Sequence, residues 1–60
     1  MSIELELIDN GYYTKDRKWA VLTNLDGVYF LYKLDTVGFY QYQGVKNIDI
    51  EYIKNYIESH

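Results

Sequence analysis

Hydrophobic and polar residues alternate along several short stretches of this chain. Residues 3–8 place isoleucine and leucine on one side and two glutamates on the other. Alternation with a period of two is typical of a β-strand that buries one face. The same pattern predicts strands over 19–24, 28–34 and 39–43, whereas 12–14 is expected to form only a short extended piece.

Turn residues separate these stretches. Asp9–Gly11 is a turn signal because Asn and Gly tolerate a positive φ angle, and in Leu25–Gly27 the glycine supplies a left-handed residue. Asp35–Gly38 forms the next turn, and 15–18 is a polar connection. We assign each of the four glycines to a turn. Short strands joined in this way predict an antiparallel meander.

The C-terminal segment, residues 50–58, has apolar residues at helical spacing. Asp49 is the expected N-cap, and Ile48 and Ile53 are expected to form a hydrophobic staple across it. A strand over 48–52 is the alternative, because apolar and acidic residues alternate there. The helix is preferred because its period continues further along the chain. The sequence therefore predicts a single α+β domain, a four-stranded antiparallel meander sheet followed by one C-terminal helix.

Both faces of this sheet need cover. The stretch 28–34 is apolar on both sides, and 19–24 is nearly so. A helix of about ten residues is about 15 Å long and covers one face at most. We therefore expect a second copy of the chain on the other face, since two-fold dimers are the commonest oligomers. The alternative is a strongly coiled sheet that folds back on itself as a small barrel, with the helix as a plug.

Composition supports an interaction role. The chain has 60 residues, eight of them tyrosine, and no cysteine. Domains this small usually gain stability from a disulfide, a metal or a partner subunit. Because this chain has no cysteine and no metal motif, a partner subunit is the expected source. Tyr and Trp are enriched at interfaces because an apolar ring carries a polar group. The candidate interface residues are Trp19, Tyr29, Tyr40 and Tyr42, together with Tyr12 and Tyr13 beside the first turn.

Catalysis by a nucleophile is not expected. The only serines are Ser2 and Ser59 near the two ends, and the only histidine is the terminal His60, which we expect to be mobile. The chain contains no glycine-rich phosphate loop or metal motif, so neither a cofactor nor a metal is predicted.

Two pairs of acidic residues lie close in the sequence, Glu4 with Glu6 and Asp49 with Glu51. They are interpreted as a solvent-facing strand side and a charged helix start.

Charge and hydropathy restrict the partners. The formal net charge is −3, whereas a nucleic-acid-binding protein should show a basic field. The one basic cluster, Lys15–Lys18, contains an aspartate and is interpreted as a solvated loop. No apolar stretch approaches membrane-spanning length, and the first residues lack the pattern of a signal peptide, so a cytoplasmic location is expected.

The aromatic hairpin Trp19–Leu34, followed by the helix Asp49–Ile57, resembles the very small, Tyr-rich, acidic proteins that phages encode to block bacterial defence systems. In size and strand-rich pattern the chain is similar to the phage inhibitors of the Hachiman defence system. This resemblance implies a non-enzymatic homodimer that disables a host protein by binding it. A small nucleic-acid-binding regulator, and a protein that sequesters a small ligand at a dimer interface, are the alternatives.

Overall fold

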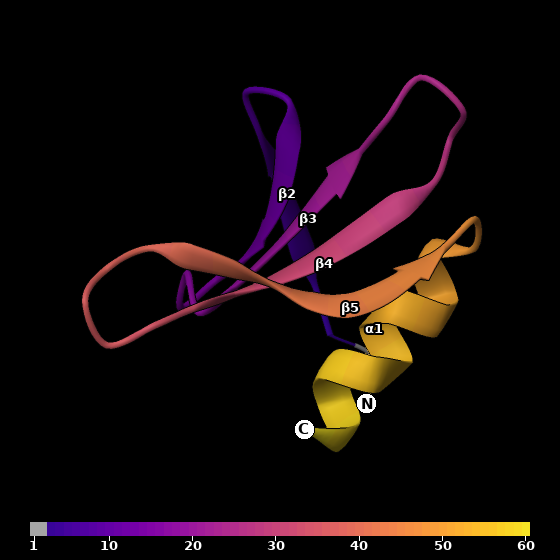
Figure 1. Ribbon diagram of the computed structural model, residues 1–60. Coiled ribbons are helices and arrows are strands. Elements are labelled where there is room, and N and C mark those ends of the chain that lie inside the picture. The colour runs from indigo at the N-terminus through magenta and orange to yellow at the C-terminus, as the bar shows by residue number, and fades with distance from the viewer. Residues whose placement is uncertain (1–2) are drawn as a thin grey trace.

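The computed structural model describes residues 3–60 and contains one antiparallel sheet and one helix (Figure 1). The sheet order follows the chain, so the strands form a simple meander. The predicted α+β fold with a C-terminal helix is confirmed. The elements are β1 (Leu5–Ile8), β2 (Gly11–Thr14), β3 (Trp19–Thr23), β4 (Tyr29–Leu34), β5 (Tyr40–Asn47) and α1 (Ile50–Ser59).

The sheet has five strands because the segment expected to be merely extended, β2, pairs on both sides. It forms a hairpin with β1, in which Ile8 lies opposite Gly11, and it continues into a pairing of Gly11 with Leu22 of β3. In the connecting turn the positive φ angle belongs to Asp9, at 55°. Gly11 instead opens the strand, so its assignment to a turn was wrong.

Strand β5 is longer than predicted because it continues through a bulge. The register with β4 shifts between Phe30 and Tyr32, which lie opposite Lys46 and Tyr42 respectively. Two extra residues of β5 are accommodated there, and Gly44 adopts a φ angle of 74°. Glycine serves here as the residue of a bulge and not of a turn, which corrects its assignment.

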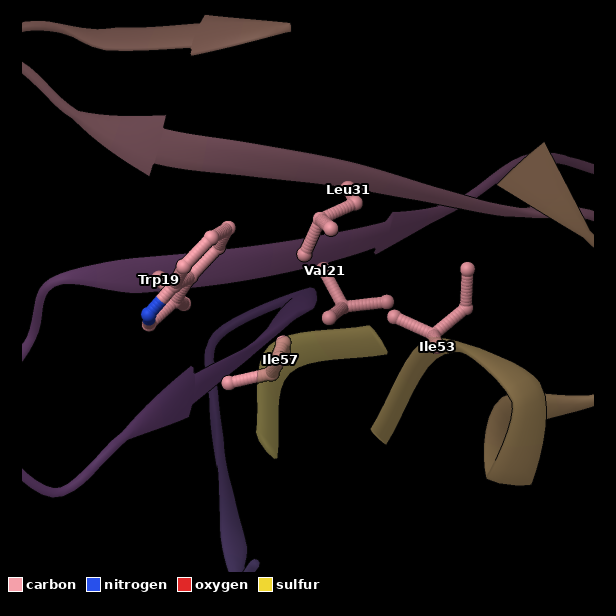
Figure 2. Packing of buried hydrophobic residues seen from close by; sticks show 5 residues of the cluster. All are labelled: Trp19, Val21, Leu31, Ile53 and Ile57. Carbon is pink, nitrogen blue, oxygen red and sulfur yellow. The ribbon is translucent and has the colours of Figure 1, made fainter. Parts of the chain in front are cut away.

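The core lies between one face of the sheet and α1 (Figure 2). Val21 and Leu31 lie opposite each other on β3 and β4, and both are fully buried. Ile53 and Ile57, one helical turn apart, pack against them from the helix, and Trp19 closes one end. Burial of side chains of this size contributes about 1.5–3 kcal/mol each, so these few contacts attach the helix to the sheet.

The start of α1 is fixed by polar contacts. The Asp49 carboxylate accepts the backbone N–H of Glu51 at 3.0 Å, as the predicted N-cap requires. The predicted hydrophobic staple is wrong, because Ile48 is 76% exposed while Ile53 is fully buried. The Asn47 side chain accepts the N–H of Asp49 at 2.8 Å, so a polar turn directs the chain into the helix. Within residues 3–60, no helix is long and apolar enough to cross a membrane.

Candidate interaction surface

Among residues 3–60, one face of the sheet packs against the helix and the other has no covering element; this second face is here called the open face. Directly paired residues share a face, which places Ala20 beside Tyr13 and Tyr32, and Leu22 beside Phe30. These side chains alternate with the core residues of the same strands, so they lie on the open face. The predicted division of β3 and β4 into two faces is confirmed.

The sheet coils over part of this face. The rings of Tyr13 on β2 and Tyr40 on β5 meet edge to face with centroids 5.8 Å apart. Two strands separate β2 from β5, so three inter-strand spacings, about 14 Å in a flat sheet, lie between them. The rings meet because the strands turn strongly from β2 to β5 (Figure 1). Ala20, which lies opposite Tyr13 on this face, is only 3% exposed.

A hydrogen bond secures this contact. The Tyr40 hydroxyl donates to the backbone carbonyl of Arg17 at 2.6 Å, in the connection between β2 and β3. One end of the open face is therefore closed within a single chain. The sheet therefore coils as in the alternative to a second covering copy, but the helix is not a plug, because α1 packs on the other face.

The other end of the open face carries the aromatic patch, defined as Leu22, Phe30, Tyr32 and Tyr42. Tyr42 is 47% exposed and Leu22 is 38% exposed. The ring of Tyr42 contacts those of Tyr32 and Phe30, with centroid distances of 5.6 and 6.0 Å. Lys46 lies opposite Phe30 and supplies a positive charge at the rim of the patch.

The six candidate interface residues divide equally between the two faces. Tyr13, Tyr40 and Tyr42 belong to the open face. The other three belong to the helix face, where they pack in or against the core. These are Trp19, Tyr12 and Tyr29.

Trp19 in particular lies in the core. It is only 8% exposed, and the Nζ atom of Lys33 lies 4.9 Å from its ring centroid. Tyr12 and Tyr29 are half-buried and contact each other edge to face at 6.3 Å. Leu22 and Phe30, which the candidate set omitted, could have been found from their position on the face opposite Val21.

The basic segment is organised by its own aspartate. The carboxylate of Asp16 accepts the backbone N–H of Lys18 at 3.0 Å and the hydroxyl of Thr14 at 2.7 Å. These hydrogen bonds, that from Lys18 first, lower the pKa of Asp16. Arg17 pairs with Glu6 of β1 at 3.0 Å. Two carboxylates therefore lie among the cations, and the segment lacks a concentrated positive field.

The residues considered for catalysis are engaged in local structure. The Ser59 hydroxyl donates to the carbonyl of Asn55, one turn back in α1. His60, expected to be mobile, stacks on Tyr56 with centroids 4.0 Å apart, and its Nδ1 lies 2.9 Å from the Tyr56 carbonyl oxygen. Ser2 lies outside the described residues. In the described range 3–60, no group of three or more acidic or histidine side chains could hold a metal ion.

A shallow depression of about 530 Å³ lies beside Trp19, between the N-terminal segment, the basic segment and the helix. Its polar lining includes Thr14 and Asp16, which are already bonded to each other. The remaining lining residues are Ile3, Glu4, Lys15 and Ile57. This mixture of groups does not define a ligand.

The β4–β5 hairpin exposes apolar residues at its tip, which projects from the sheet at the end away from α1 (Figure 1). Val37 is 77% exposed and Phe39 is 64% exposed. One oxygen of the Asp35 carboxylate accepts the backbone N–H groups of Val37, Gly38 and Phe39, each at 2.9 Å. The hairpin tip is thus held in one conformation, which sequence reasoning did not reveal.

No protein-family model matches this chain, and neither the curated proteins nor the solved structures show a significant similarity to it. The fold and the surface therefore define only a class, a small α+β domain with an aromatic patch on the uncovered side of its sheet.

Proposed function

We propose that this chain is a non-enzymatic protein-binding domain that docks on a larger protein as a homodimer and acts as its inhibitor or as an adaptor. The observation that carries the proposal is the aromatic patch, where Leu22 and Tyr42 remain exposed beside two further aromatic rings. In the setting that the resemblance to phage inhibitors implies, the target is a host defence protein or enzyme in the host cytoplasm.

The chemistry of the patch suits a protein surface. Tyrosine and other aromatic side chains dominate binding energy where they fill apolar pockets, because their large rigid rings lose little conformational entropy. Tyr42 is supported by Phe30 and Tyr32, so its ring is held in place before binding. Lys46 at the rim favours a partner with an apolar centre and an acidic group at its edge.

Two matched pairs of variants test the proposal. Leu22→Glu places a charge in the patch, and Leu25→Glu makes the same change in the β3–β4 turn, where Leu25 is fully exposed. Tyr42→Glu is matched by Tyr52→Glu, since Tyr52 on the helix is 52% exposed. Circular dichroism checks that all four variants fold.

Immobilised chain is then used to capture protein from a lysate of the cell in which it acts. The unmodified chain and both control variants should retain one stoichiometric protein, and both patch variants should lose it at least tenfold. The proposal fails if no stoichiometric protein is retained, or if the patch variants capture it as well as their controls do.

A further inference from the structure

We propose that two copies of this chain join through the outer edge of β5, pairing antiparallel about a two-fold axis at Gln41. This inference rests on the homodimer of the proposed function and specifies its contact. The resulting sheet would be continuous across the two copies, with both helices on the same side.

The two edges of the sheet are protected to different degrees. Strand β1 has four residues, and its Glu6 pairs with Arg17. Strand β5 has eight residues, and the stretch from Thr36 to Val45 contains neither a charged residue nor a proline. Natural proteins normally block a long edge strand with charges, prolines or a cover, so an uncharged edge is suited to pairing.

The backbone groups available at this edge are those of Tyr40 and Tyr42. The N–H of Asp35, which directly follows β4, donates to the carbonyl of Phe39, so the backbone groups of Phe39 face β4. Residues of an antiparallel strand alternate between inward and outward bonding, so Gln41 also faces β4. The N–H and C=O groups of Tyr40 and Tyr42 therefore point away from the sheet.

The register follows from the bulge and from the two faces. The open faces of the two copies lie on the same side of the joined sheet only if the two-fold axis lies at a residue, which is then opposite its own counterpart. This is because successive side chains alternate between the two faces. The bulge at Gly44 interrupts the regular edge. An axis at Gln41 avoids it, and Tyr40 of each copy then exchanges two hydrogen bonds with Tyr42 of the other.

This pairing would join the aromatic surfaces of the two copies. Tyr40, already in contact with Tyr13, would lie beside Tyr42 of the second copy on the open face. Leu22 and Phe30 lie away from the β5 edge, on β3 and β4, and would stay accessible to a target. The dimer contact and the target contact would therefore be adjacent parts of one face.

Single cysteines test the register directly, because the chain contains none of its own. At the axis, a non-hydrogen-bonded pair has Cα atoms about 4.5 Å apart, so Gln41→Cys can form a disulfide with its counterpart. Gln43→Cys is the matched control on the same strand and face. Its counterpart would lie four residues away along the strand, about 14 Å. Thr36→Cys in the hairpin turn measures random collision.

Under mild oxidation, Gln41→Cys should cross-link at least tenfold faster than the other two cysteine variants. Light scattering over a dilution series should show a dimer of the unmodified chain. Tyr42→Pro removes an outward N–H together with the Tyr42 ring, whereas Tyr42→Leu removes the ring alone. The proline variant should give a folded monomer, and the leucine variant should remain a dimer. The inference would be overturned if Gln41→Cys and Gln43→Cys cross-linked at equal rates, or if Gln41→Cys cross-linked no faster than Thr36→Cys.

The outcome is separable from that of the proposed function. A monomeric chain that captures a target through the aromatic patch would overturn this contact and leave the binding role intact. A dimer cross-linked through Gln41→Cys that captures no protein would do the reverse.

Discussion

Replacing Tyr13 and Tyr40 by leucine, singly and together, measures how strongly these two rings hold one end of the open face closed. The two rings meet edge to face at 5.8 Å, and such pairs contribute about 0.5–1.5 kcal/mol beyond the area they bury. Leucine keeps most of the apolar volume, so each variant should fold. We expect the double-mutant cycle to show a coupling of about 0.5–1.5 kcal/mol.

The hydroxyl of Tyr40 is measured separately. Tyr40→Phe removes its hydrogen bond to the Arg17 carbonyl and should lower the free energy of unfolding by about 1 kcal/mol. This loss occurs in both Tyr40→Leu variants of the cycle, so it does not enter the coupling. A domain of 60 residues has a stability of about 3–9 kcal/mol, which leaves the variants measurable.

Urea unfolding followed by the fluorescence of Trp19 is the assay, because this residue is the only tryptophan and lies in the core. Tyr13→Leu combined with Tyr52→Leu is the control, since Tyr52 is exposed on the helix and these two changes should add. A coupling between Tyr13 and Tyr40 within about 0.3 kcal/mol of zero would show that the rings do not meet, and the coiled closure would be refuted.

Three further changes test local features. Hydrogen bonds, that from the Phe39 N–H first, hold the pKa of Asp35 below its ordinary value of 3.8. The resulting stabilisation is therefore present above pH 3.8 and is lost as the pH falls through the folded-state pKa. The urea midpoint should decrease when the pH is lowered from about 6 to about 3, and it should decrease less in Asp35→Asn. Gly11→Ala brings a Cβ atom to 2.8 Å from Leu22 Cδ2, the end of a 38% exposed side chain that can turn aside, so the free energy of unfolding in urea should change by no more than about 0.5 kcal/mol; a larger loss would show that Leu22 is held in place. Asp9→Val should cost about 1–2 kcal/mol in the same assay, because Asp9 has a φ angle of 55°; an unchanged midpoint would contradict the left-handed turn.

The alternation of hydrophobic and polar residues was sufficient to predict most of the fold. The strands over 19–24 and 28–34 lie within one residue of their predicted ends, because their turns carry strong signals such as Gly27, which has a φ angle of 80°. The helix and its cap at Asp49 were also predicted correctly, since both depend on local spacing. These features need no knowledge of which strands become neighbours.

The features missed by sequence reasoning depend on contacts between distant residues. Strand β2 is short, and only its pairing with β1 and β3 makes it a strand. Trp19 was expected at an interface because its residue type favours interfaces, but its position opposite Lys33 on the helix face places it in the core. The meeting of Tyr13 with Tyr40 depends on the coiling of the whole sheet, which a local pattern does not encode.

The coiled closure also changes where a second copy fits best. The expected dimer was to cover the open face because a single chain would leave that face in water. Tyr13 and Tyr40 meet at one end of that face, where Ala20 is already buried within a single chain, so the area that needs cover shrinks to the aromatic patch. The outward N–H and C=O groups of β5 have no hydrogen-bond partner among residues 3–60. Unpaired backbone groups at a strand edge favour pairing with another strand. A dimer through this edge would accommodate both observations, because it leaves Leu22 and Phe30 of the aromatic patch accessible to a target and gives the outward backbone groups of β5 hydrogen-bond partners.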